Sequence, residues 1–166
     1  MQITLELIKK EQKEILRNLL EKYEYEFSQY TGDDINELGL FGYDYLDTYW
    51  NDTGRFPYFI KVDGKLAGFA MICDYPIADI QTDFIMSEFF VIYKYRGTGI
   101  AGNCVEKLLN MHQGKWALMF HPENIISKKF WLKTINKCTN GNYQQMTHEQ
   151  VHYNGTPASI LIFETN

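Results

Sequence analysis

The sequence of 166 residues has no apolar stretch that approaches the length of a membrane span, and it contains only three cysteines. The N-terminal residues MQITLELIKKEQKE reach charged side chains before the apolar core of a secretion signal could form. Cys73, Cys104 and Cys138 are widely spaced, so they match neither a disulfide framework nor a metal-binding knuckle. We therefore expect a cytoplasmic protein with no membrane partner.

Net positive charge is also lacking. The formal net charge is −5, which argues against nucleic acid as a partner. Residues 31–52 hold six acids and no Lys or Arg, whereas residues 94–137 hold eight Lys or Arg against Glu106 and Glu123. One end of the molecule therefore favours a cation and the other an anion, unless the two segments are simply solvated surfaces of opposite sign.

Apolar residues make up 45% of the chain and aromatic residues 16%, which indicates a globular protein with a substantial core. The length suits one domain, residues 1–166, and no repeat, low-complexity tract or linker divides it. Apolar runs predict strands, and apolar residues at helical spacing predict helices. Strands are expected at 2–7, 57–62, 66–73, 82–92 and 116–120 and twice more near the C-terminus, with helices at 9–29, 99–112 and 124–136.

The segment 82–120 is predicted as strand, helix, strand, a unit whose two strands should run parallel with a right-handed connection. The other strands form hairpins, one turned by Asp63-Gly64 and one by Asn154-Gly155. Residues 31–52 are expected to form a loop with one short helix. The prediction is an α+β fold, with a mixed, mostly antiparallel central sheet that contains one parallel pair and is flanked by helices.

The stretch HEQVH, His148 to His152, matches the H-E-x-x-H pattern of zinc metalloproteases. That site needs both imidazoles on one helix face, where residues four apart lie roughly 6 Å from each other. In a strand the same spacing is roughly 13 Å, too far for one zinc ion. A hairpin turn follows directly and no helical pattern precedes it, so we predict a strand and no metal.

The stretch YRGTGIAG, Tyr95 to Gly102, lies between a buried strand and an amphipathic helix. Its consecutive N–H groups can point at one anion, and the helix N-terminus adds the positive end of its dipole. It is not a Walker A loop, because Gly-Lys-Ser/Thr is missing, and it does not complete the G-x-G-x-x-G pattern. The residues alone indicate an anion-binding turn or a tight strand-to-helix connection.

The segment EFFVIYKYRGTGIAGNCVEKLL resembles the acetyl-CoA signature of the GNAT acyltransferase superfamily, Arg/Gln-x-x-Gly-x-Gly/Ala, with Arg96, Gly99 and Ala101 at those positions. Downstream, the run from Asn124 to Trp131 resembles the superfamily's Asn-x-x-Ala-x-x-Phe-Tyr helix. The order of elements agrees over essentially the whole chain. This resemblance implies a GNAT-like, three-layer fold in which the parallel strands splay apart to hold acetyl-CoA as cosubstrate.

The resemblance also implies which residues hold the cosubstrate. Backbone groups of the strand would bond the pantetheine arm, and amides of the glycine-rich turn would hold the pyrophosphate. The cofactor-binding residues implied in this way are Phe89, Phe90, Val91, Arg96, Gly97, Thr98, Gly99, Ile100, Ala101, Gly102, Asn124, Ser127 and Trp131.

An amine would attack the thioester directly, which requires a base and an acid. Glu88 is the candidate base, because it is the sole acid in the run from Phe84 to Val91, near the splay that the resemblance implies; otherwise it pairs with a lysine or orients the substrate. The superfamily's usual acid is a Tyr, and here Trp131 stands at that position. The acid is then another residue, with Tyr143 and Tyr153 as candidates, or solvent.

The acids and aromatic residues of 31–52 are expected to shape the acceptor pocket, with Tyr43, Asp44 and Tyr45 contacting a cationic amine. The alternative is an acidic surface over aromatic core residues. The predicted function is acetyl-CoA-dependent N-acetylation of a small-molecule amine, with a homodimer left open. Two alternatives remain, a silent acyl-CoA-binding domain and an acetyltransferase that modifies protein lysines or N-termini.

Overall fold

A computed structural model describes every residue from Met1 to Asn166 and contains one sheet of seven strands. The strands are β1 (Ile3–Leu7), β2 (Arg55–Val62), β3 (Lys65–Cys73), β4 (Phe84–Val91), β5 (Gly114–Phe120), β6 (Tyr143–Tyr153) and β7 (Thr156–Thr165). Their order in the sheet is β1-β2-β3-β4-β5-β7-β6. Only β4 and β5 run parallel, and every other neighbouring pair is antiparallel.

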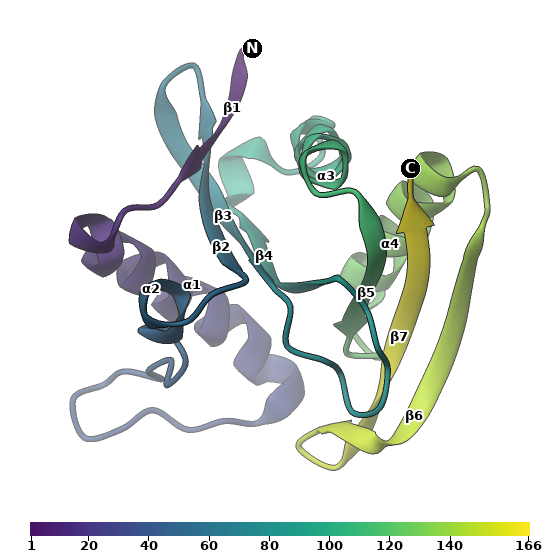
Figure 1. The fold of residues 1–166 in the computed structure, drawn as a ribbon. Helices are drawn as coiled ribbons and strands as arrows, with labels where there is room; N and C mark the ends of the chain where they lie inside the picture. The colour runs from purple at the N-terminus through teal and green to yellow at the C-terminus, as the bar shows by residue number, and fades with distance from the viewer.

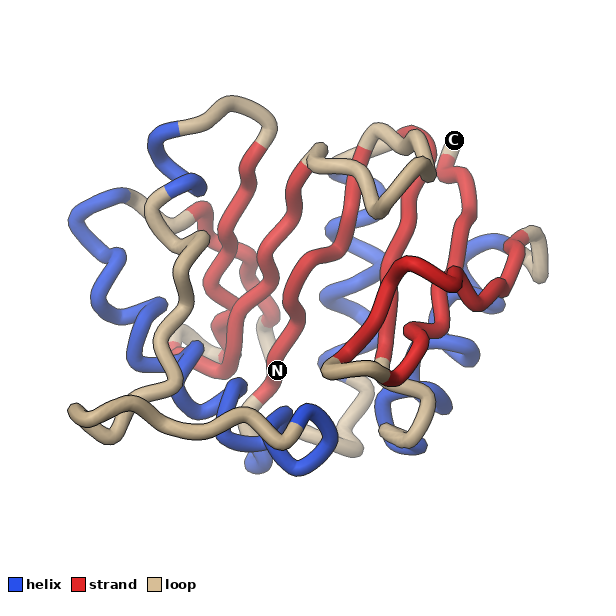
Figure 2. Tube along the Cα trace, turned by 90° about the horizontal axis from the view of Figure 1, so that it is seen from below, coloured by secondary structure: helices blue, strands red, loops and turns tan.

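Helices cover both faces of this sheet (Figures 1 and 2). The helices are α1 (Lys13–Thr31), α2 (Thr48–Asn51), α3 (Ile100–Met111) and α4 (Ile125–Thr139), with single 3₁₀ turns at Lys10–Gln12 and Tyr93–Tyr95. One core packs α1 and α2 against Phe59 and Phe69, and another packs α3 and α4 against Trp116. The predicted α+β class and the three layers are confirmed. None of the helices is both long and apolar enough to cross a membrane.

Both predicted hairpin turns are present. The φ angles are 48° at Asp63 and 75° at Gly64, and 46° at Asn154 and 88° at Gly155. Two successive residues with positive φ are what a type I′ turn requires, and Asp or Asn followed by Gly adopts them with little strain. These turns join β2 to β3 and β6 to β7.

The parallel pair separates soon after it begins. Strands β4 and β5 pair only from Phe84 to Met86 on one side and from Trp116 to Leu118 on the other. Beyond that point β4 remains paired with β3 as far as Val91. The backbone groups on the β5 side of Phe89 to Val91 therefore face an opening instead of a neighbouring strand, as the splay predicted from the resemblance requires.

A β-bulge precedes Glu88. The pairing of β3 with β4 changes from Met71 opposite Glu88 to Ile72 opposite Met86, so Ser87 is an extra residue in β4. Without the bulge, Met86 and Glu88 would point to the same face of the sheet. Instead Met86 packs into the core under α3 and α4, while Glu88 contacts Tyr43 on the α1 side. The bulge thus aims the candidate base away from α4.

The HEQVH stretch is part of a strand, as predicted. It lies in β6, whose pairing with β7 is irregular between Thr147 and His152. The two histidines make different contacts, because Nε2 of His148 bonds Asp79 at 2.9 Å while His152 lines a cavity. No group of three His, Cys, Asp or Glu side chains in the chain is arranged to hold a metal ion.

Candidate active site

A cavity of about 740 Å³ lies where β4 and β5 separate. Its walls come from α1, β4, the turn before α3, the start of α4, and the tip of the β6–β7 hairpin. The predicted site residues that line it are Glu88, Phe89, Phe90, Val91, Arg96, Gly97, Ala101, Asn124, Ser127 and Trp131. The cavity thus brings together predicted residues from three separate segments of the sequence, 88–91, 96–101 and 124–131.

The turn before α3 presents unpaired amides. Gly97 and Gly99 have φ angles of 72° and 84°, and a Cβ atom added at Gly97, Gly99 or Gly102 would meet nothing within 4 Å. The amides from Gly97 to Gly102 donate no hydrogen bond to the protein, and α3 begins at Ile100. Successive free N–H groups at a helix N-terminus form an anion-binding site. The Ile100 side chain is in the core, so this residue offers the site its amide alone.

Arg96 braces the same turn. Its Nε donates to the carbonyl oxygen of Val91 at 2.6 Å, and its Nη2 pairs with Glu26 of α1 at 2.9 Å. The guanidinium also lies over the ring of Tyr93, 4.1 Å from its centroid. These contacts tie the end of β4 to α1 and to the turn. Thr98 adds a bond from its hydroxyl to the carbonyl oxygen of Tyr95 at 2.7 Å.

The start of α4 forms the opposite wall. The side-chain oxygen of Asn124 accepts a hydrogen bond from the Ser127 amide at 3.0 Å, which caps the helix. Phe130 stacks on Phe89, with ring centroids 5.8 Å apart, and Trp131 meets the edge of Phe89 at 5.5 Å. Trp131 is 7% exposed, so its indole serves mainly as packing for the wall.

Glu88 is held as a partly protonated carboxyl. The Tyr43 hydroxyl donates to its Oε1 at 3.0 Å. Burial raises the pKa of Glu88 to about 7, and hydrogen bonds from Tyr23 and Tyr43 offset part of that rise. No lysine pairs with it. A carboxylate whose pKa lies near neutrality can take a proton from a substrate and release it again at physiological pH.

Glu24 is a second carboxyl in the cavity and was not predicted from the sequence. Burial raises its pKa to about 7, and the negative charges of Glu88, Asp33 and Glu21 add to the rise. The periodicity that predicts the helix 9–29 assigns no role to Glu24. Only the position of the cavity shows that α1 ends beside an opening, and the sequence carries no signal for it.

Of the three residues predicted to contact the acceptor, one bonds a residue of the site. None of the three lines the cavity, and Tyr43 is connected to it only through its hydrogen bond to Glu88, which does line it. Tyr45 is 68% exposed and meets the ring of Tyr43 edge-on, at 6.2 Å between centroids. From the acidic segment only Thr31 and Asp33 line the cavity, because the chain leaves the site after α1 and follows the surface.

The tip of the β6–β7 hairpin lies beside the end of α1 (Figure 1), and its residues His152 to Asn154 line the cavity. The Asn154 side chain donates to the carbonyl oxygen of Thr31. The Tyr153 ring lies 5.3 Å from Phe27 and 5.5 Å from His121, centroid to centroid. Burial and the charge of Glu88 raise the pKa of Tyr153. Of the two tyrosines considered as acids, Tyr153 lines the cavity and Tyr143 packs against the core.

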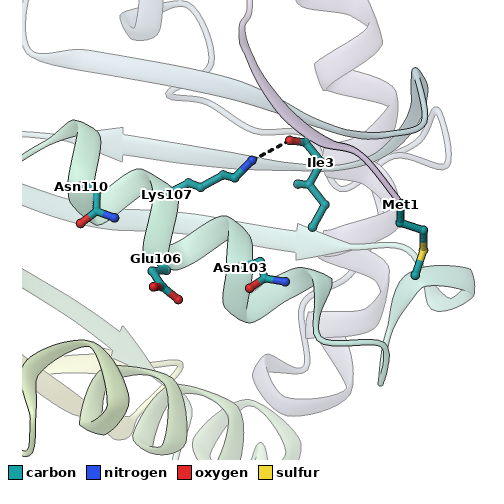
Figure 3. Close-up of a pocket in the computed structure, with 6 residues that line it drawn as sticks. All are labelled: Met1, Ile3, Asn103, Glu106, Lys107 and Asn110. Carbon is teal, nitrogen blue, oxygen red and sulfur yellow. Dashed lines mark hydrogen bonds between the residues drawn. The ribbon is translucent and has the colours of Figure 1, made fainter.

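A smaller hollow of about 310 Å³ lies outside this region, between β1 and α3 (Figure 3). Its main polar contact is the Lys107 ammonium, which donates to the carbonyl oxygen of Ile3 at 2.7 Å. It shares no residue with the larger cavity and contains neither a histidine nor a cysteine. The chemistry therefore concentrates in the larger cavity.

The fold has known counterparts. An acetyltransferase from Thermus thermophilus is 12% identical, with a TM-score of 0.71 over 99% of this chain and 97% of that one. The spermidine N-acetyltransferase of Vibrio cholerae, solved with CoA and spermine, is 15% identical, with a TM-score of 0.64 over 99% and 96%. The aminoglycoside acetyltransferase AAC(6′)-Ib, solved with ribostamycin and coenzyme A, is 13% identical, with a TM-score of 0.68 over 99% and 94%.

The sequence itself identifies the family, although no curated protein matches the chain. The model of the acetyltransferase (GNAT) family matches residues 13–135, which include α1, the splayed strands, the glycine-rich turn and most of α4. The chain belongs to the acetyltransferase (GNAT) family.

Proposed function

We propose that the chain transfers the acetyl group of acetyl-CoA to a primary amine of a small cationic molecule. The observation that carries this proposal is Glu88, a carboxyl with a pKa near neutrality in a cavity that is bordered by Gly97 and Ala101 of the nest of free backbone amides. The cytoplasm is the proposed location, consistent with three free cysteines.

The residues present fit the cosubstrate. Amides of Gly97 to Gly102 suit a pyrophosphate. The edge of β4 from Phe89 to Val91, which β5 leaves unpaired, suits the amide groups of a pantetheine arm, although Arg96 occupies the carbonyl oxygen of Val91. When bound, acetyl-CoA supplies the activated acyl group. The protein's part is to align the thioester with the base, through β4 on one side and the packing of Trp131 and Phe130 on the other.

In the proposed step, Glu88 takes a proton from the incoming ammonium, and the neutral nitrogen forms a bond to the carbonyl carbon. The carbon–sulfur bond breaks as that bond is completed, and the sulfur keeps the electron pair. The nitrogen loses its second proton to solvent as the amide forms. The departing sulfur acquires a proton either directly from solvent or from Tyr153, which lines the cavity and would then be reprotonated by solvent. Tyr23 and Tyr43 hold the Glu88 carboxyl in place between the two events.

The walls of the cavity support a cationic acceptor. The carboxyls of Glu24, Asp33 and Glu88 line it together with the rings of Tyr23, Tyr30 and other aromatic residues, and both attract ammonium groups. Two structural counterparts, solved with spermine and with ribostamycin, also hold molecules with several amino groups.

The test is a screen of CoA release from acetyl-CoA, detected as free thiol, with small amines, amino acids and lysine-containing peptides as acceptors. Release with small cationic amines and not with peptides is the expected result. Release with peptides alone would favour a protein-modifying enzyme. Binding of acetyl-CoA without release from any acceptor would identify a silent binder, the alternative that the absence of a tyrosine at position 131 keeps open.

Replacing Tyr43 by Phe should shift the pH dependence of the reaction. The lost hydrogen bond stabilises ionised Glu88, so its removal raises the pKa of the carboxyl further. Because the base acts in its ionised form, the rise of kcat/KM with pH should move to higher pH. A full pH profile for both proteins measures this, and Tyr45→Phe, on an exposed ring, is the matched control. A profile displaced to lower pH would contradict the assignment.

Replacing Trp131 by Phe should leave turnover nearly unchanged. The indole packs on Phe89 and Phe130, and we assign it no proton transfer. Trp131→Tyr places the superfamily's usual hydroxyl in this wall, and turnover rises if departure of the thiolate limits the rate. CoA release at saturating acetyl-CoA measures both variants. Collapse of turnover in Trp131→Phe, with unchanged cofactor affinity, would show that the indole is not passive.

A further inference from the structure

The acidic side chains that line the cavity are Glu24, Glu26, Asp33 and Glu88, and all but one have a partner. Glu26 pairs with Arg96 at 2.9 Å, and Asp33 accepts a bond from the Thr31 hydroxyl at 2.6 Å. Glu88 accepts the bond from Tyr43. Glu24 forms neither a hydrogen bond nor an ion pair with any group of the protein, although it is half-buried.

No cation of the protein is available to Glu24. Arg96 is the only Lys or Arg that lines the cavity, and it is engaged by Glu26 and by the carbonyl oxygen of Val91. A half-buried carboxylate without a counter-charge destabilises its surroundings, and a bound cation relieves that cost. No positive charge of the protein therefore balances the negative charge of Glu24.

The geometry of α1 places Glu24 beside the reacting end of the cavity. Tyr23, the preceding residue, contributes a hydroxyl to Glu88, while Phe27 and Tyr30 continue along the same side of the helix at spacings of four and seven. Their rings line the cavity between Glu24 and the hairpin tip, where Tyr153 meets Phe27 edge-on. Aromatic faces accommodate methylene groups and ammonium groups alike.

We propose that Glu24 is a specificity-determining residue that selects acceptors carrying a second positive charge in addition to the amine that is acetylated. This inference rests on the proposed function. Glu88 removes the proton from the reacting nitrogen, so that nitrogen loses its charge during the reaction and cannot compensate Glu24. A second ammonium, on the same molecule, keeps its charge and pairs with Glu24 throughout. The acceptor class is thus a short diamine or a polyamine.

The test compares acceptors that differ only in that second charge. The probes are 1,4-diaminobutane and 1,6-diaminohexane, each set against the amino alcohol of the same chain length, 4-aminobutanol and 6-aminohexanol. For the wild type, kcat/KM of the better diamine, corrected for its two equivalent amines, should exceed that of its amino alcohol by about tenfold or more, as expected for a partly buried charge pair.

Glu24→Gln should bring that ratio close to one, chiefly by raising KM for the diamine, because only the diamine carries the second charge that Glu24 would pair with. Glu14→Gln is the matched control, because it removes the same charge from an exposed position of α1 and should keep the wild-type ratio. Binding of acetyl-CoA by each variant, measured by calorimetry, confirms that the fold is retained.

Two outcomes overturn the inference alone: a wild-type ratio near one, or a ratio that survives in Glu24→Gln. In both cases the amino alcohols still release CoA, so the proposed function stands. Absence of CoA release from every amine overturns the proposed function and this inference with it.

Discussion

Replacing Gly99 by Glu should abolish acetyl-CoA binding while the fold persists. A side chain at this position enters open space at the amide nest, because an added Cβ meets no atom within 4 Å. A carboxylate held about 4 Å from a phosphate, at the effective dielectric of a protein surface, is repelled by about 4 kcal/mol, or about a thousandfold in affinity. The φ angle of 84° adds strain for any residue with a Cβ atom.

Two controls separate charge from strain. Gly64→Glu introduces the same side chain at a φ angle of 75°, also with no neighbour within 4 Å, in the β2–β3 turn outside the cavity. It should bind acetyl-CoA like the wild type. Gly99→Ala introduces the strain without the charge and should retain part of the affinity. If calorimetry finds that Gly99→Glu binds acetyl-CoA as tightly as the wild type, the assignment of the nest is wrong.

Glu88→Gln should lower turnover by about 10²–10⁴, the usual contribution of a general base, with the affinity for acetyl-CoA unchanged. The carboxamide has nearly the same shape and can still accept the hydrogen bond from Tyr43, but it cannot take a proton. Steady-state rates with an acceptor that enters protonated measure the loss. An unchanged rate at neutral pH would remove Glu88 from the mechanism and direct attention to His121 or to water.

The same substitution should stabilise the fold at alkaline pH. The folded protein holds Glu88 with a pKa of about 7, above the ordinary value of 4.5, so it binds more protons than the unfolded chain between these values. Stability therefore falls as the pH rises through this interval and stays lower above it. Glu88→Gln removes the contribution of Glu88 to this dependence, while Glu24, whose pKa is also raised to about 7, keeps its own. The melting temperature of the variant should therefore exceed that of the wild type at pH above about 7. Equal curves at all pH values would show that the carboxyl is not desolvated.

The helices and strands were predictable wherever the local sequence determines the backbone conformation. The Asp63-Gly64 turn and the apolar runs on either side of it identify β2 and β3. The α1 helix was expected at 9–29 and lies at Lys13–Thr31, because a 3₁₀ turn takes up the residues before it. Local patterns do not encode the bulge at Ser87, since it follows from how β4 pairs with β3, which lies elsewhere in the sequence.

The candidate site was predictable in its backbone parts and less so in its side chains. The glycine-rich turn and Glu88 are identified by local motifs and by position in a strand. Local motifs do not identify Glu24 and Tyr23 as residues of the candidate site. Their position beside it depends on the opening between β4 and β5, which is a property of the folded sheet. Asp44 was expected beside the acceptor from composition alone, and composition does not determine the path of a loop.

The position of β7 has a consequence for synthesis. This strand lies between β5 and β6 although it follows both in sequence, and its hairpin carries the contact from Asn154 to Thr31. A growing polypeptide that has not yet reached Thr156 leaves β5 and β6 with unpaired edges, which are prone to associate with other chains. The cavity therefore closes only after this hairpin has left the ribosome, long after the glycine-rich turn and Glu88 have been translated.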